Sequence, residues 1–194
     1  MRGSAGRGTA AACAVVSLVV GGCAAAPSPL AAPSAADVPS APATAPVPDG
    51  CVIPTQTGVL PSDRLVDADV TTVGGSDRIA FRFGAPSDEI AESRGTLRRV
   101  DPPFFEGGSG ARVAVAGSRF IEIRFDGLLI VGDDGVPIFQ GERDRRLGMP
   151  AITEVAVVDE FEGVMTWIVG IRGPGCVVLG GDAAGVVTVD IRHG

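Results

Sequence analysis

Side chains able to perform general acid–base or nucleophilic catalysis are few in this chain of 194 residues. The chain has a single histidine, His193, one residue from the C-terminus. A Ser-His-Asp or Cys-His site needs a histidine that the surrounding fold holds in place. Because a terminal residue is a poor candidate for that role, the sequence argues against nucleophilic catalysis.

Paired carboxylates are the other possible source of chemistry, since a glycosidase needs two carboxyl groups facing each other across a cleft. Acidic pairs include Asp67 with Asp69, Asp133 with Asp134, and Asp159 with Glu160. The Asp133-Asp134-Gly135 run is typical of a turn. Asp67 and Asp69 fall on one face of a predicted strand, where solvated charges are common. We therefore expect no enzymatic activity, no catalytic residue and no cofactor.

The thiol of Cys23 has a sequence context that suggests modification. Arg2 and Arg7 precede an apolar run at residues 9–20, and two glycines separate this run from Cys23. This order is that of a secretory signal. As a helix the run spans about 18 Å, well short of the ~30 Å hydrocarbon core of a bilayer.

The small-small-Cys ending at Cys23 resembles a bacterial lipobox, which implies cleavage before this residue and its diacylation, for example with palmitate. Two acyl chains hold a protein at a membrane without a spanning segment. Ordinary cleavage after Ala24–Ala26 remains the alternative.

The remaining thiols form an even pair, Cys51 and Cys176, because Cys13 leaves with the signal peptide. An even pair in an oxidising compartment indicates a disulfide, with two free thiols as the alternative. In the chain-entropy picture this bridge would stabilise the domain by about 4–5 kcal/mol. Two cysteines and one histidine do not supply a closed zinc shell, so that we expect no metal.

Composition divides the chain into a signal peptide (1–22), an Ala/Pro-rich tether (23–61) and one folded domain (62–194). Residues 24–49 include ten alanines and seven prolines. Proline blocks helix formation, so the segment favours an extended, disordered linker of polyproline II type that reaches roughly 80 Å. The formal net charge is −7, which opposes binding of nucleic acid or anionic lipid heads.

The domain alternates apolar and polar residues in the manner of half-buried strands. Ile79, Phe81 and Phe83 alternate with polar or small residues, and so do Ile121, Ile123 and Phe125. The runs 152–158 and 164–171, the second containing Trp167, are apolar on both faces and read as central strands.

Segment 85–95 reads as either a helical turn or a loop. Eight or nine short strands without a long amphipathic helix predict an all-β fold, an antiparallel β-sandwich whose two sheets pack face to face. These inward-facing strand residues and Trp167 should form the core.

Candidate binding residues are exposed aromatic and basic side chains in predicted loops. Phe161 lies between acidic residues at a hairpin tip, and Phe104 and Phe105 follow Pro102-Pro103. Packing back onto the core is the alternative role for each. The densest basic cluster consists of Arg143, Arg145 and Arg146. It is suited to binding wall carboxylates or phosphates, and a solvated loop is the alternative.

Four stretches together resemble the AMIN-like domain of actinobacterial lipoproteins, over roughly residues 66–193. They are Asp77–Phe83, Gly108–Gly110 with Val115–Ser118, Glu160–Trp167 with Gly170–Gly173, and Val189–His193. The resemblance implies a β-sandwich akin to the AMIN domain, which directs envelope proteins to peptidoglycan. It implies no catalytic residues.

We therefore expect a monomeric extracytoplasmic lipoprotein, anchored to the outer face of the cell membrane through Cys23. Its β domain should bind the envelope, through peptidoglycan or another wall polymer, without catalysis. The alternative is a lipoprotein that docks an envelope enzyme or assembly by protein–protein contact. Nucleic acid is not an expected partner.

Overall fold

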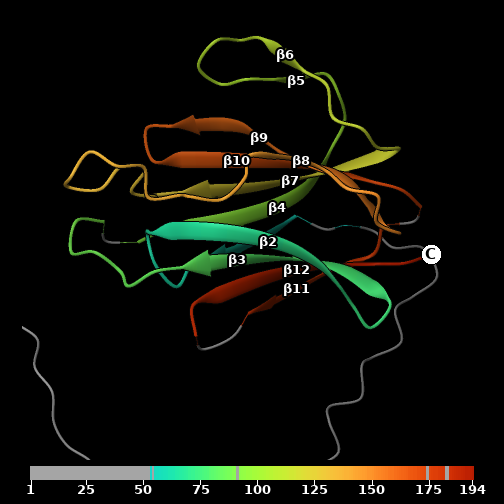
Figure 1. Cartoon of the computed structure of the whole chain (residues 1–194), viewed down its shortest axis with the longest axis horizontal. Helices are drawn as coiled ribbons and strands as arrows, with labels where there is room; N and C mark the ends of the chain where they lie inside the picture. The colour runs from blue at the N-terminus through green and yellow to red at the C-terminus, as the bar shows by residue number, and fades with distance from the viewer. Residues whose placement is uncertain (1–52, 54, 91, 174, 182–183) are drawn as a thin grey trace, which may run out of the picture. The chain divides into compact units, whose positions relative to one another are not determined.

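The computed structural model describes residues 53, 55–90, 92–173, 175–181 and 184–194. The predicted signal peptide, Cys23, Cys51 and the linker up to residue 52 lie outside these residues. Within the described ranges the protein is all-β and antiparallel and contains no helix, as the sequence predicts (Figure 1). Accordingly, this part of the chain holds no apolar helix long enough to cross a membrane.

Two sheets lie face to face, and a small hairpin lies on the far side of the larger sheet (Figure 1). The six-stranded sheet has the order β1 (Gln56–Val59), β4 (Arg94–Val100), β7 (Arg119–Asp126), β10 (Val164–Ile171), β9 (Ile152–Phe161) and β8 (Asp144–Arg146). The four-stranded sheet has the order β11 (Val177–Gly181), β12 (Val186–Arg192), β3 (Ser76–Phe83) and β2 (Leu65–Val73). The hairpin consists of β5 (Phe104–Phe105) and β6 (Arg112–Val113).

The core between the sheets follows from the predicted alternation. All seven residues expected to face inward are buried there: Ile79, Phe81, Phe83, Ile121, Ile123, Phe125 and Trp167. Phe81 packs edge-on against both Phe125 and Trp167, with ring centroids 4.9 and 5.5 Å apart. A shift of one residue would place Arg78, Arg82, Glu122 and Arg124 in this core, so the pattern fixes the register.

The runs that are apolar on both faces are central strands, as predicted. β10 lies between β7 and β9, and nearly all of its side chains are buried. One face of β10 meets the four-stranded sheet, and the other carries Ile168 into a second apolar cluster. This second cluster lies on the outer face of the six-stranded sheet and also contains Phe104, Phe120 and Val158.

Several strand boundaries differ from the sequence interpretation. β1 lies within the segment assigned to the tether and pairs with β4, so the folded domain begins before residue 62. β9 continues through Phe161, and the turn to β10 is the pair Glu162-Gly163, both with positive φ. The segment before β4 is a loop, which Asp63 holds by accepting hydrogen bonds from the backbone and side chain of Ser87.

Asp77 connects the two sheets through a fully buried carboxylate. It accepts hydrogen bonds from the backbone N–H groups of Ala151 and Ile152, at 2.7 and 2.9 Å, where β9 begins. Thr72 donates at 3.0 Å, and His193 Nε2 lies 2.8 Å from the same carboxylate. His193 is therefore held against the four-stranded sheet, not frayed as its terminal position suggested.

We predict that acid weakens the fold through Asp77 and Asp63. Burial would raise both pKa values, but hydrogen bonds from Ile152, His193, Ala151 and Thr72 lower the pKa of Asp77, and those from Ser87 lower that of Asp63. A carboxyl group whose pKa is lower in the folded state than in the unfolded state stabilises the fold at pH values above its unfolded pKa of about 3.9. This stabilisation is lost as the pH falls below that value. Urea unfolding should give a nearly constant free energy between about pH 7 and 5 and a decline below about pH 4.

The control is Asp77→Asn, which removes one of the two carboxyls. Its stability should be lower at neutral pH and should fall less steeply in acid. A stability that rises as the pH drops below 4 would contradict the assignment.

Candidate functional site

The β5–β6 hairpin is fixed to the outer face of the six-stranded sheet by three contacts. Phe104 packs edge-on against Phe120, with ring centroids 5.0 Å apart. The backbone N–H of Gly107 donates to the carbonyl of Val158 at 3.1 Å. After β6, the N–H of Ala116 donates to the buried Glu154 carboxylate at 2.7 Å. The hairpin therefore covers one half of the sheet's outer face and leaves the other half open.

Glycine makes this close approach possible at two positions. A Cβ at Gly170 would overlap the carbonyl of Ala116, and one at Gly107 would overlap the carboxylate of Asp159. At Gly170 the clash is with backbone, so a larger residue would push the segment after the hairpin away from the sheet. At Gly107 a larger residue would displace the Asp159 side chain. The position of the hairpin thus depends on glycines, which have no Cβ, as well as on apolar contacts.

A hollow of about 350 Å³, which we call the hairpin groove, lies where the hairpin ends and the open half of the sheet begins. It crosses four neighbouring strands, β4, β7, β10 and β9. The sheet contributes Arg98, Val100, Glu122, Arg124, Val158, Asp159, Thr166 and Ile168. The hairpin and its approach contribute Asp101, Pro103, Phe104, Phe105 and Gly107.

The register of β9 brings two consecutive residues into this groove. Thr166 lies opposite Asp159 and Trp167 lies opposite Val157, so Val158 is an extra residue on β9. Such a bulge turns the strand locally and redirects side chains. As a result both Val158 and Asp159 line the groove, although a regular strand would send them to opposite faces.

The arginines of the groove are already paired. Arg98 binds Glu122 through two hydrogen bonds of 2.6 and 3.0 Å, and Arg124 Nη2 lies 2.7 Å from Asp126. Hydrogen bonds to these carboxylates raise the pKa of both guanidinium groups, which stay charged. The positive charges of both arginines are thus compensated by neighbouring carboxylates, which leaves little positive charge for a ligand.

On the sheet side of the groove, two polar groups have no partner of this kind. Thr166 is only 6 % exposed, and its Oγ1 atom makes no hydrogen bond. Leaving a buried hydroxyl unsatisfied costs about 1–3 kcal/mol. Within the described ranges, the Asp159 carboxylate makes neither an ion pair nor a side-chain hydrogen bond, and it lies beside Arg124 across β10. Both groups thus line the groove without such a partner in the described part of the chain.

A second hollow, of about 330 Å³, lies on the other side of the Gly107 contact. Its lining includes Phe161, which is 60 % exposed, and Arg143. Arg143 binds Glu160 through hydrogen bonds of 2.5 and 2.9 Å, and its guanidinium lies 5.2 Å from the ring centroid of Phe139. This basic residue is thus also neutralised.

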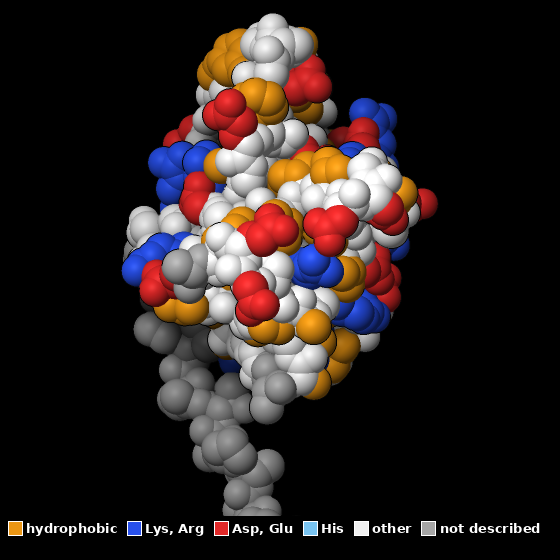
Figure 2. All heavy atoms as spheres, turned by 90° about the vertical axis from the view of Figure 1, so that its left-hand side faces the viewer, with side chains coloured by type: hydrophobic (Ala, Val, Ile, Leu, Met, Phe, Trp, Pro, Cys, Tyr) orange, Lys and Arg blue, Asp and Glu red, His pale blue; other side chains and the backbone are white. Residues whose placement is uncertain are grey.

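The candidate binding residues proposed from the sequence do not lie together in the structure. Phe105 is 54 % exposed at the hairpin groove, whereas Phe104 is buried between the hairpin and the six-stranded sheet, against Phe120. Arg145 pairs with Glu142 at 3.1 Å and with Asp69 at 3.7 Å, and Arg146 lies 3.6 Å from Glu154. Arg143, Arg145 and Arg146 therefore do not form one basic patch. Figure 2 shows acidic and basic side chains interspersed on one face of the domain.

Sequence reasoning missed Thr166 and the Arg98–Glu122 pair, and it considered Asp159 only as one member of an acidic pair and not as a binding residue. One signal was present: Thr166 is a hydroxyl within the otherwise apolar run 164–171. The bulge that directs Asp159 toward it left no such mark in the sequence.

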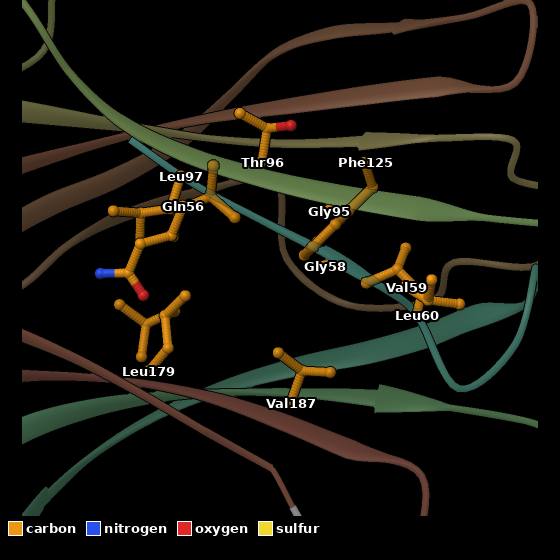
Figure 3. A pocket seen from close by; sticks show the side chains of 12 residues that line it. Gln56, Gly58, Val59, Leu60, Gly95, Thr96, Leu97, Phe125, Leu179 and Val187 are labelled. Atoms are coloured by element: carbon orange, nitrogen blue, oxygen red, sulfur yellow. The ribbon is translucent and has the colours of Figure 1, made fainter. Parts of the chain in front are cut away.

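A third space, the inter-sheet gap, opens between the edge strands β1 and β11 (Figure 3). It measures about 90 Å³ and its lining is almost wholly apolar, with Leu60, Leu97, Leu179 and Val187 among its residues. In Figure 3 the side chain of Gln56 points from β1 toward Leu179 of β11. Just before β11, Cys176 is disulfide-bonded. Its predicted partner Cys51 lies outside the described residues, so that pairing stays a prediction.

Comparison with known proteins gives one match. The AMIN-like domain family model matches residues 64–193, in agreement with the resemblance seen in the sequence. This range includes every strand from β2 to β12 and all residues of the hairpin groove. No curated protein and no solved structure matches the chain.

Adjacent phenylalanines test the attachment of the hairpin. Phe104→Ala should destabilise the fold by about 3 kcal/mol, because it leaves a cavity between the hairpin and Phe120. Phe105→Ala removes an exposed ring and should change the free energy of unfolding by less than about 0.5 kcal/mol. Chemical denaturation measures both. Equal effects of the two substitutions would show that the hairpin is not held through Phe104.

Proposed function

Because the chain belongs to the AMIN-like domain family, we propose that it is a membrane-anchored lipoprotein whose β domain binds a polymer of the cell wall. Family membership indicates an envelope-associated, extracytoplasmic protein. The finer proposal combines this membership with the sequence of the N-terminal region and with the surface of the domain.

The observation that carries wall binding is the hairpin groove within the family-matched region. It is an open hollow that crosses four strands and combines an exposed phenylalanine, Phe105, with polar groups that lack partners. Ligand sites in proteins join apolar walls to a few placed polar groups in this way. Four strands at a spacing of about 4.8 Å give the groove a length of roughly 14 Å, which suits an elongated polymer.

We propose that the domain binds without catalysis. His193, the chain's one histidine, is engaged by Asp77 at the edge of the core and lies outside the hairpin groove. The two groove carboxylates that belong to the sheet, Glu122 and Asp159, lie on the same face of it, whereas a glycosidase opposes its two carboxyls across the substrate.

Anchoring through Cys23 gives this binding a mechanical role. A lipid at Cys23 and an Ala/Pro-rich linker would hold the domain at the outer face of the membrane and let it reach into the wall. The protein would thereby connect membrane and wall, or keep a wall-binding module at the membrane surface.

A second candidate function is the docking of an envelope protein, and the inter-sheet gap favours it. Among the described residues β1 and β11 are edge strands of their sheets, and Val59 of β1 and Leu179 of β11 are exposed apolar residues beside the gap. A partner strand could pair with such an edge and place a side chain in the gap.

Sedimentation with insoluble cell wall tests the first function. The purified protein should sediment with peptide-bearing peptidoglycan and should release no soluble fragments from it. Phe105→Ala should weaken binding roughly tenfold, as expected for loss of an exposed aromatic contact. Leu179→Ala, at the inter-sheet gap, is the matched control and should bind normally. Absence of sedimentation, together with a defined protein recovered by crosslinking, would instead support docking.

Lipid anchoring is tested by Cys23→Ala. The substitution removes the only thiol at the predicted cleavage site, so lipid labelling should be lost and the protein should move from the membrane to the soluble fraction. Cys13→Ala, within the predicted signal peptide, is the control and should leave labelling intact. Membrane partitioning that persists in Cys23→Ala would overturn the proposed lipid anchor.

A further inference from the structure

We propose that the hairpin groove recognises the glycan strand of the wall polymer, a neutral chain of N-acetylated amino sugars, and not its charged peptide or phosphate groups. This inference rests on the proposed wall-binding function and names the part of the polymer that the groove contacts. Four features of the described residues lead to it.

The first feature is the charge of the groove. Arg98 is paired with Glu122 and Arg124 with Asp126, so no guanidinium is left free to bind a carboxylate or a phosphate. Within the described residues, the groove charges without an ion pair are both negative, on Asp159 and Asp101. An anionic ligand would meet these carboxylates, and like charges at short range oppose binding.

The second feature is the unpartnered hydroxyl on the groove floor. Thr166 is more than nine-tenths buried and faces outward on β10, between Arg124 of β7 and Asp159 of β9. Its Oγ1 atom can donate one hydrogen bond and accept others. Sugar hydroxyl and acetamido groups both donate and accept, and therefore satisfy this atom without bringing a charge.

The third feature is the acceptor beside that hydroxyl. A carboxylate such as Asp159 accepts hydrogen bonds only, and hydrogen bonds to a charged acceptor are stronger than those between neutral groups. Adjacent hydroxyls of a sugar ring are suitable donors. The Asp159 carboxylate occupies the space that a Cβ at residue 107 would need, so Gly107 leaves room for it.

The fourth feature is the apolar wall. Phe105, Phe104 and Ile168 line the same groove, with the Phe105 ring half exposed. One face of an amino-sugar ring carries C–H groups that pack against an aromatic ring, while its edge carries the hydroxyls. The groove thus offers an apolar surface and hydrogen-bonding groups within one hollow, which matches the two-sided character of a sugar.

Thr166→Val tests the polar floor with little change of shape. Because the hydroxyl has no partner in the protein, the substitution should leave the free energy of unfolding unchanged or increase it. It should nevertheless weaken binding of an uncharged N-acetylglucosamine oligomer about fivefold, as expected for one hydrogen bond. Thr153→Val is the matched control: Thr153 also carries a buried hydroxyl without a partner, but it lines none of the three spaces described above.

The measurement is an NMR titration of the full mature chain with three probes: an N-acetylglucosamine oligomer, glycan strands whose lactyl carboxyl groups are blocked as amides, and the free stem peptide. Binding of the two glycan probes, weakened by Thr166→Val and by Asp159→Asn but not by Thr153→Val, is the expected result. Asp159→Asn keeps the side-chain shape and provides a second variant if Thr166→Val alters folding.

The other outcomes separate the two proposals. Sedimentation with intact wall but titration only by the stem peptide would overturn the glycan assignment and leave wall binding in place. Glycan binding that both groove variants leave unchanged would move the site elsewhere on the domain. Binding to neither the wall nor any probe would overturn both proposals.

Discussion

The carboxylate of Asp77 is the link on which the arrangement of the two sheets depends. A buried charge is tolerated only where hydrogen bonds replace its lost hydration. Here the donors come from both sheets: Thr72 of the smaller sheet, and the backbone of Ala151 and Ile152, where β9 of the larger sheet begins. Because Asp77 must keep these donors, it fixes the start of β9 relative to the four-stranded sheet, and His193 closes the remaining side.

The register of β9 in turn determines the outer face of the larger sheet. From its fixed start, β9 reaches the bulge that directs both Val158 and Asp159 outward. Val158 joins the apolar cluster that the hairpin covers, and Asp159 remains at the border of that cluster. The hairpin groove is this border. It exists because the outer face is apolar at one end, where a third layer packs, and charged at the other.

Charge pairing within the open half of the face limits the kind of molecule that it suits. Cross-strand pairs such as Arg98 with Glu122 stabilise a sheet modestly when exposed. Their larger consequence is that each arginine is neutralised by the domain itself. Arg143 follows the same rule with Glu160. A surface whose basic groups are paired in this way favours neutral, hydrogen-bonding ligands over anionic ones, despite the number of arginines in the chain.

The sequence alone determined the fold class and the core, since the alternation of Ile79, Phe81 and Phe83 leaves only one face of the strand able to enter an apolar interior. It also supplied the family. It could not determine the groove, because Arg98 and Phe105 come from one stretch of the chain and Asp159 and Thr166 from another, distant one. The two stretches are brought together by strand order, a bulge and a hairpin that packs through Phe104. Periodicity indicates which face of a strand is buried. Which strands lie beside it, and thus which polar groups meet across the sheet, is decided only by long-range pairing in the tertiary structure, such as that of β4 with β7 and of β7 with β10.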